Sequence, residues 1–199
     1  MATADKPICI GVLAMQGAFR EHGRMLEQLG CEITQVRKPA DLDNLDGLVI
    51  PGGESTTIGK LMDKYDLFAA MSQKLAARMP VFGTCAGLIL LAKEIRGSEQ
   101  PRLGVMDIKV QRNGYGRQVD SFEADLAAPV FGDKPFRAVF IRAPFIEAVG
   151  AGAEVLAEWA DRPVMARQEN MLVCSFHPEL TDDPRIHNYF LQMVREARS

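Results

Sequence analysis

A cysteine in a tight, glycine-flanked turn is the first candidate for chemistry in this sequence. Residues 83–87 read Gly-Thr-Cys-Ala-Gly, directly after the apolar run Val81–Gly83 and directly before the apolar run Leu88–Ala92. This pattern is typical of a nucleophile on a sharp strand-to-helix turn, where small neighbours permit a strained backbone. The positive end of the helix dipole would favour the thiolate of Cys85, and the Ala86 amide would face a developing oxyanion. The alternative is a tight turn that holds an inert thiol.

A histidine and a glutamate follow the last apolar run of the chain, Met171–Phe176, in the order His-Pro-Glu. The residue before a proline is extended, and residues i and i+2 of an extended segment point the same way. His177 could therefore face Glu179, deprotonate a thiol and later protonate a leaving group, while Glu179 holds its tautomer. An exposed loop histidine beside a solvated acid is the alternative. The other histidines are less promising, because His22 lies on the buried side of the first predicted helix and His187 near the start of the last.

A glycine-rich loop ends a third apolar run, Gly47–Ile50, and reads Pro-Gly-Gly-Glu-Ser-Thr-Thr over residues 51–57. Paired glycines let backbone amides approach a ligand closely, so Gly52 and Gly53 could complete an oxyanion hole. The loop lacks the Gly-Lys-Ser/Thr ending of a P-loop, which disfavours a nucleotide phosphate site. A simple glycine-rich turn is the alternative.

The elements that would position these residues alternate between strands and helices. Continuous apolar runs predict buried parallel strands at Ile8–Ala14, Gly47–Ile50 and Val81–Gly83, and we expect a further strand at Glu32–Val36. The first helix has an apolar face formed by Phe19, His22, Leu26 and Leu29 and should end at Gly30, and a later one has a face formed by Leu67, Phe68, Met71 and Leu75. This order predicts an α/β fold with three layers and a mostly parallel, doubly wound sheet. Such sheets place ligands at the carboxyl ends of their strands, which would bring Cys85 and His177 together.

The segment from about Leu103 to Arg167 has short strand-like runs broken by Gly, Pro and Asn. We interpret it as antiparallel additions, with Asn113-Gly114 as a hairpin turn, and not as a second domain. Residues 1–199 would then form a single domain with a short loose leader at 1–7. Asp183 and Pro184 should provide the N-cap and N1 of a terminal helix, whose buried face would consist of Ile186, Phe190, Met193, Val194 and Ala197.

Composition excludes several classes of partner. The 199 residues carry 23 Lys and Arg against 26 Asp and Glu, a net charge of −3, and no basic block, so nucleic acid is not expected. Apolar runs fall short of the roughly 20 residues of a membrane helix, and the N-terminus lacks a secretory h-region, which favours a cytoplasmic location. The four cysteines form no Cys-x-x-Cys pair, which argues against zinc or a redox dithiol. Cys9, Cys31 and Cys174 should pack as small inert hydrophobes.

With these motifs established, the chain resembles the triad-type (class I) glutamine amidotransferases with a flavodoxin-like fold. Within them it resembles the glutaminase subunits of pyridoxal 5′-phosphate synthase, the PdxT/SNO family. The resemblance rests on residues 13–22 (Leu-Ala-Met-Gln-Gly-Ala-Phe-Arg-Glu-His), 51–58, 83–87, 111–118 (Gln-Arg-Asn-Gly-Tyr-Gly-Arg-Gln), 140–144 (Phe-Ile-Arg-Ala-Pro) and 176–181. The elbow and His-Pro-Glu are shared by the whole class, whereas the Gly-Gly-Glu-Ser-Thr-Thr and Arg-Asn-x-x-Gly-Arg-Gln strings are more particular to this subunit.

The resemblance implies that glutamine is hydrolysed to glutamate and that ammonia passes to a separate (β/α)₈ synthase subunit. That subunit would combine it with a pentose phosphate and a triose phosphate, so pyridoxal phosphate is a product and no metal or organic cofactor is needed. Carried onto this sequence, Cys85 is the nucleophile and His177 and Glu179 complete the triad, with the amides of Gly53 and Ala86 as the oxyanion hole.

The resemblance also implies a glutamine site and a partner interface. The glutamine site would consist of Gly52, Gly53, Glu54, Arg112, Ile141 and Arg142, in which a guanidinium suits the ligand carboxylate. The Gln16-Gly17 loop would lie near the active site and the interface. Because a subunit that hydrolysed glutamine alone would be wasteful, we expect the Gly52-Gly53 loop to be completed only on docking.

Three other functions are consistent with the same residues. The chain could serve another acceptor enzyme, or it could be a cysteine peptidase-like hydrolase on the same scaffold, since a fold does not fix a substrate. A non-enzymatic binding or regulatory subunit is the third.

Overall fold

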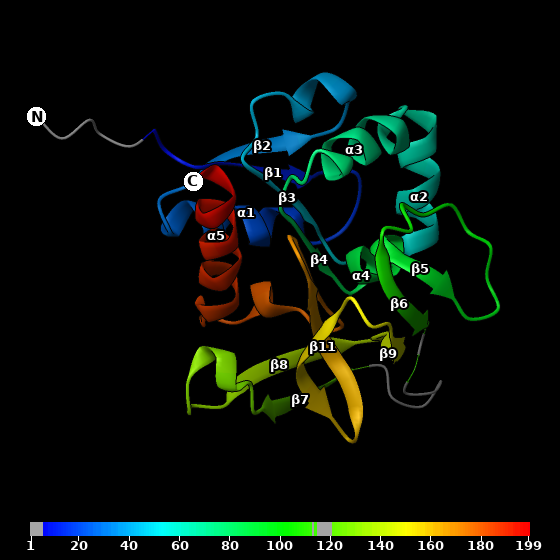
Figure 1. The fold of residues 1–199 in the computed structure, drawn as a ribbon, viewed down its shortest axis with the longest axis vertical. Coiled ribbons are helices and arrows are strands. Elements are labelled where there is room, and N and C mark those ends of the chain that lie inside the picture. The colour runs from blue at the N-terminus through cyan, green and yellow to red at the C-terminus, as the bar shows by residue number, and fades with distance from the viewer. Residues whose placement is uncertain (1–5, 113, 115–120) are drawn as a thin grey trace, which may run out of the picture.

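Five parallel strands form the centre of the protein in a computed structural model, which describes residues 6–112, 114 and 121–199 (Figure 1). Two antiparallel strands extend this sheet at one edge, giving the order β10-β11-β12-β4-β3-β1-β2 within the described residues. The strands are β1 (Cys9–Leu13), β2 (Glu32–Val36), β3 (Gly47–Ile50), β4 (Val81–Thr84), β10 (Glu154–Trp159), β11 (Arg162–Gln168) and β12 (Met171–Cys174). The predicted mostly parallel α/β sheet is confirmed.

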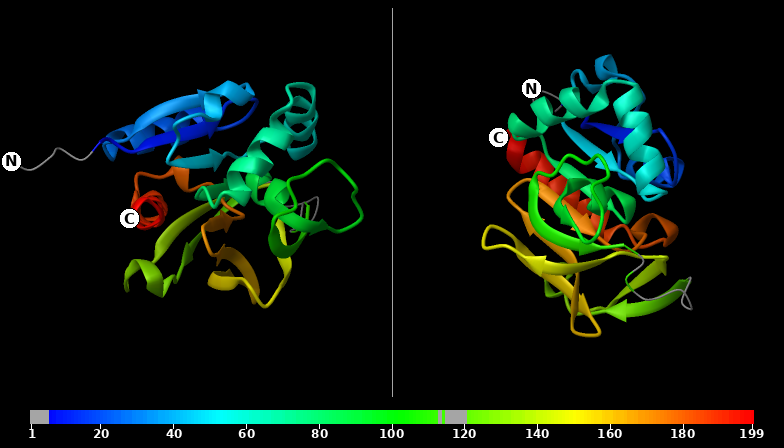
Figure 2. Two further views of the ribbon diagram at one scale, coloured as in Figure 1. Left: turned by 45° about the horizontal axis from the view of Figure 1, so that its top comes forward. Right: turned by 90° about the vertical axis from the view of Figure 1, so that its right-hand side faces the viewer.

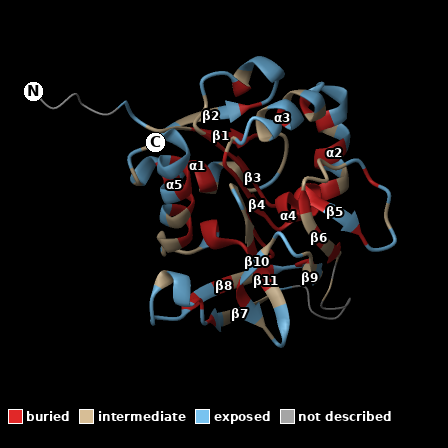
Figure 3. Cartoon of the chain, in the orientation of Figure 1, coloured by how far each residue is buried: buried red, intermediate tan, exposed pale blue. Residues whose placement is uncertain are grey.

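Apolar side chains on both faces of the sheet explain why its central strands read as continuous apolar runs. Alternate residues of one strand point to opposite faces, so Ile10 and Val12 join one buried cluster and Leu13 joins the other. The first cluster contains side chains of α1 (Phe19–Gln28) and α5 (Arg185–Arg198). The second contains side chains of α2 (Ser55–Lys64), α3 (Leu67–Ala76) and α4 (Ala86–Leu91). Helices therefore cover both faces, and the buried residues gather between the layers (Figures 2 and 3).

The additions between α4 and β11 form two small sheets. One consists of β5 (Ala92–Ile95), β6 (Met106–Gln111) and β9 (Phe145–Val149), and the other of β7 (Ser121–Leu126) and β8 (Phe136–Ile141). The pairs β6–β9 and β7–β8 are antiparallel as predicted, whereas β5–β6 is parallel.

The predicted hairpin turn at Asn113-Gly114 lies, apart from Gly114, outside the described residues. The strand before it, β6, pairs with β5 and β9, whereas the strand after it, β7, pairs with β8. Val110 of β6 belongs to the second buried cluster and Leu126 of β7 to the first. The described strands on either side of this segment therefore lie in different layers and do not pair with each other.

The helices follow the predicted periodicity, with shifts at their ends. Gly30 adopts φ 84° beyond the end of α1, as a left-handed helix stop requires. The terminal helix begins at Arg185, so Pro184 is its N-cap and not N1, while Asp183 accepts the Arg185 amide at 3.1 Å. Ala197, which the periodicity places on the buried face of this helix, is exposed. Of the predicted leader, residues 1–5 lie outside the described part, and Lys6 and Pro7 are exposed.

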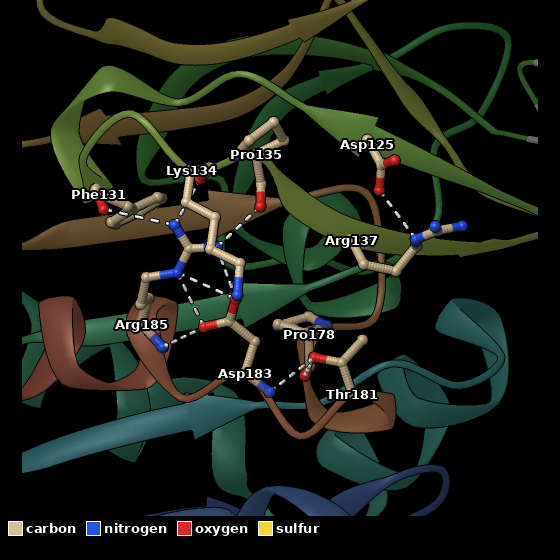
Figure 4. A network of polar contacts seen from close by, with 9 residues as sticks. All are labelled: Asp125, Phe131, Lys134, Pro135, Arg137, Pro178, Thr181, Asp183 and Arg185. Carbon is tan, nitrogen blue, oxygen red and sulfur yellow. Dashed lines mark hydrogen bonds and ion pairs between the residues drawn. The ribbon is translucent and has the colours of Figure 1, made fainter.

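An arginine network fixes the start of α5 against the connection between β7 and β8 (Figure 4). The Arg185 guanidinium donates to the backbone carbonyl oxygens of Lys134 at 2.6 Å and Pro135 at 3.0 Å. The same group pairs with the Asp183 carboxylate, with 2.6 Å between Nη2 and Oδ2. Since α5 packs on the main sheet, the network anchors the smaller sheet to it.

Every helix in the described part of the chain lacks the length and apolar content that a membrane crossing requires.

Candidate active site

The predicted motifs converge beyond the carboxyl ends of four neighbouring strands. Gln16 follows β1, Gly52 follows β3, Cys85 follows β4 and His177 follows β12. These strands are adjacent in the order β12-β4-β3-β1, so positions far apart in the sequence meet at one edge of the sheet. This is where an open α/β sheet places its ligands.

Cys85 stands on a strained turn between β4 and α4. Its backbone has φ 48° and ψ −98°, a left-handed conformation that a side chain makes costly, while its amide donates to Cys174 O at 2.8 Å. A Cβ on Gly87 would overlap the carbonyl of Ile50 in β3, which explains why glycine occurs two residues after the cysteine. The predicted elbow is confirmed in its geometry.

His177 and Glu179 face one another as the sequence predicts. His177 Nδ1 lies 2.7 Å from Glu179 Oε1, and His177 and Cys85 line the same pocket. Cys85 and His177 are each 7% exposed and Glu179 is 6% exposed, so the three groups are nearly removed from water. The exposed-loop alternative for His177 is therefore wrong.

The charged forms of the histidine and the glutamate support one another. Burial lowers the pKa of His177, but its interactions with Cys85 and Glu179 outweigh burial and raise that pKa to about 10. Burial raises the pKa of Glu179, yet His22 and His177 outweigh it and the net pKa is below the ordinary value. This arrangement favours an imidazolium on His177 beside a carboxylate on Glu179.

The loop after β3 is fixed at three points beside this group. Gly52 N donates to Thr84 Oγ1 at 3.0 Å, Gly52 O accepts from Ala18 N at 3.1 Å, and Glu54 N donates to Gln16 Oε1 at 2.7 Å. A Cβ on Gly52 would overlap the His177 ring. Glycine is needed here because the backbone itself packs against the imidazole.

A pocket of about 300 Å³ opens beside Cys85 and His177. Its walls include five of the six residues predicted for substrate binding: Gly53, Glu54, Arg112, Ile141 and Arg142. Gly52, the sixth, lies against the imidazole of His177.

The Glu54 carboxylate accepts hydrogen bonds from the amides of Thr56 and Thr57 at the start of α2. Burial raises the pKa of Glu54, but these hydrogen bonds outweigh burial and lower that pKa to about 2. Glu54 therefore caps α2 and stays ionised, 3.3 Å from Arg112 Nη2.

Sequence reasoning missed a layer of polar residues behind the site. His22, Thr84 and His187 are fully buried, and His22 Nε2 lies 3.3 Å from Glu179 Oε2. Gln100 accepts from Arg112 Nη1 at 3.1 Å and orients that guanidinium. The helical spacing correctly predicts that His22 is buried. No sequence signal indicates which distant groups a buried side chain contacts.

The four cysteines are free thiols. Burial raises the pKa of Cys31 and that of Cys174, which is consistent with inert packing. Within residues 6–112, 114 and 121–199, no cluster of three or more His, Cys, Asp or Glu side chains is arranged to hold a metal ion.

Known proteins similar to this chain share almost its full length. Residues 12–196 match the SNO glutamine amidotransferase family. The pyridoxal 5′-phosphate synthase subunit PdxT of Carboxydothermus hydrogenoformans is 60% identical over 93% of this chain and 97% of its own length. PdxT of Pelotomaculum thermopropionicum is 61% identical over 94% of this chain and 96% of its own length.

Solved structures agree with these relatives. A crystal structure of a glutamine amidotransferase superposes with a TM-score of 0.89 at 52% identity, covering 94% of this chain and 98% of that one. The structure of PurLQS from Thermotoga maritima has a TM-score of 0.67 at 16% identity, covering 94% of this chain and 98% of that chain, and shows the shared fold. From its sequence match and its geometry, this chain belongs to the SNO glutamine amidotransferase family.

Proposed function

We propose that this chain is the glutaminase subunit of a pyridoxal 5′-phosphate synthase. It hydrolyses L-glutamine to L-glutamate and ammonia, and the ammonia passes to the synthase subunit. The observation that carries the proposal is the buried His177–Glu179 pair, which lies beside Cys85 at the edge of a pocket. The names of the PdxT relatives supply the partner.

The reaction begins when the Cys85 thiolate attacks the side-chain amide carbon of glutamine. The amides of Gly53 and Ala86 hold the oxyanion of the tetrahedral intermediate. His177 then donates its proton to the departing ammonia, leaving a glutamyl thioester on Cys85. A water molecule that gives a proton to His177 hydrolyses the thioester, and glutamate and the free cysteine result. Glu179 holds the His177 ring in place throughout.

The pocket suits the polar ends of an amino acid. Arg112 and Arg142 supply guanidinium groups for the α-carboxylate, while the ionised Glu54 is available to the α-ammonium group. Ile141 covers the aliphatic part of the ligand. We assign Gly52, Gly53 and Glu54 to the glutamine site together with these three residues.

The whole chain, residues 1–199, is proposed to act as one amidotransferase domain, supported by the family match over residues 12–196. Its location is proposed to be cytoplasmic, which agrees with four unpaired thiols in the described chain.

The test is the release of glutamate from glutamine with and without the synthase subunit, using Cys85→Ala as the control. We expect activity that requires Cys85 and rises when the synthase subunit is added. Activity that needs Cys85 but ignores the synthase subunit would identify another acceptor enzyme. Turnover of peptides but not glutamine would favour a peptidase, and glutamate release that does not depend on Cys85 would refute the mechanism.

A further inference from the structure

All three histidines of the chain lie in one buried network, although the proposed mechanism uses only His177. Glu179 connects two of them, since its Oε1 lies 2.7 Å from His177 Nδ1 and its Oε2 lies 3.3 Å from His22 Nε2. His22 Nδ1 in turn lies 2.9 Å from His187 Nε2. The network thus joins α1 and α5 to the segment that carries the triad.

The position of the proton on His22 follows from its neighbours. Glu179 Oε2 is a buried carboxylate oxygen that has no hydrogen-bond partner among the described residues. His22 Nε2 lies 3.3 Å from it as a charge contact, while the hydrogen bond of that nitrogen is with Thr84 Oγ1 at 3.1 Å. A lone pair on that nitrogen would oppose the carboxylate, whereas an N–H group stabilises it. The neutral ring then has a lone pair on Nδ1, which accepts from His187 Nε2–H. His187 Nδ1, which has no hydrogen-bond partner in the described chain, is left as an unprotonated lone pair.

The surroundings favour neutral rings for both outer histidines. His22 and His187 are fully buried and contact the edge of Phe82, with ring centroids 5.9 Å and 5.8 Å away. The charged or titratable groups that face His22 are Glu179, His177, Glu21 and His187. Burial is the largest influence on the pKa of His22 and of His187, and it lowers both, the latter to about 3.

His22 Nε2 is also connected to the Gly52 loop through Thr84. His22 Nε2 lies 3.1 Å from Thr84 Oγ1, and Thr84 Oγ1 accepts the Gly52 amide at 3.0 Å. One imidazole therefore lies between the acid of the triad and the anchor of the proposed oxyanion loop.

We propose that His22 is a positioning residue which, held in its Nε2–H form by His187, fixes Glu179 and the Gly52 loop for catalysis. The inference rests on the proposed glutaminase function, which it extends to a second layer. It assigns Thr84, the residue before Cys85 in the elbow motif, as the link between Glu179 and the Gly52 loop.

A matched pair of substitutions isolates the donor. A glutamine side chain places its Nε2 as many bonds from the backbone as histidine Nε2, whereas asparagine is one carbon shorter and reaches only as far as Nδ1. His22→Gln therefore keeps a donor for Glu179 and His22→Asn does not, while both put an amide in the same site.

The primary assay measures kcat and KM for glutamine with the full chain and its synthase subunit. We expect His22→Asn to lower kcat about 10-fold or more, as for loss of one hydrogen bond to a charged group, with KM within about threefold of wild type. The acid limb of the pH profile of kcat should move to higher pH by about half a unit or more in this variant, because Glu179 takes up a proton more readily without the donor. The other titratable groups that face Glu179 are His177 and Cys174. His22→Gln should keep kcat within about threefold of wild type. Equal loss in both folded variants, or wild-type behaviour in both, overturns the proposal.

A second measurement does not depend on activity or on a variant that folds. In the wild-type protein labelled at histidine, NMR of the ring nitrogens near neutral pH should show His22 neutral with its proton on Nε2. A proton on Nδ1, or a doubly protonated ring, overturns the proposal. If wild type releases no glutamate but His22 has the expected tautomer, the proposed function fails while the assigned network stands.

Discussion

Glu179→Gln tests the triad most directly, because it removes a charge without changing the size of the side chain. In the structure the carboxylate faces two ring nitrogens, His177 Nδ1 at 2.7 Å and His22 Nε2 at 3.3 Å. A carboxylate can accept from both, but a glutamine amide has only one oxygen, so its NH₂ group must face one of the two rings. In either rotamer of the amide, the substitution therefore weakens the interactions that orient the His177 ring.

The size of the effect follows from the bond that is lost. A hydrogen bond to a charged group contributes about 1.5–3 kcal/mol. If this free energy is lost from the transition state, kcat decreases about 10- to 150-fold. KM should stay within about threefold, because Glu179 does not line the pocket. The pKa of His177 should fall from about 10, since one of the groups that raise it is gone.

The assay is steady-state glutamate release in the presence of the synthase subunit, with thermal unfolding followed by circular dichroism. The variant should fold, since a neutral amide avoids the cost of a buried charge. Glu179→Asp serves as a matched control, because it keeps the charge but shortens the reach to His177. A folded Glu179→Gln protein with wild-type kcat would refute the role of Glu179.

Three further results follow from the structure. Iodoacetamide should alkylate Cys85 well before Cys174, whose pKa burial raises. Equal alkylation rates in the native protein, measured by peptide mass spectrometry, would contradict the assignment of Cys85 as the nucleophile. Burial, with a contribution from His22, lowers the pKa of His187 to about 3, so the unfolded chain takes up a proton below about pH 6.5 that the folded chain does not. The free energy of unfolding should thus fall by about 2–3 kcal/mol between pH 6.5 and 4.5 from this group, and His187→Leu should flatten that slope in urea titrations; an unchanged slope would count against it. Arg185→Lys should lower the free energy of unfolding by about 1–3 kcal/mol, since an ammonium group cannot reproduce the fork to two carbonyls and Asp183, and an unchanged denaturation midpoint would show that the network is dispensable.

Local patterns predicted the parts of the fold that depend on local physics. The observed limits of the strands Glu32–Val36 and Gly47–Ile50 agree with the predicted ones, because turn residues bound both segments. The stop at Gly30 was predicted because a left-handed residue favours glycine. The predicted N-cap of the terminal helix, Asp183, lies one residue before the observed N-cap, Pro184, and helix ends are the positions where such boundaries vary most.

Strand pairing beyond neighbouring elements was not predictable in this way. Asn113-Gly114 has the composition of a hairpin turn, yet β6 and β7 pair with other strands in different layers. Pairing there depends on which buried cluster each apolar face joins, a property of the assembled layers and not of the turn. Sequence spacing likewise does not indicate that β5 and β6 run parallel.

The proposed reacting groups of the active site can be identified from local motifs in the sequence. The elbow around Cys85 and the His-Pro-Glu segment carry their chemistry in adjacent residues, because a strained turn and an extended dipeptide each orient side chains locally. The order of strands then placed both at one edge of the sheet. The residues behind them are known only from the three-dimensional structure, in which His22 on α1 lies against Glu179 and His187 on α5 contacts His22. A buried polar side chain takes whatever partner the packing of distant elements provides, and no local pattern records that partner.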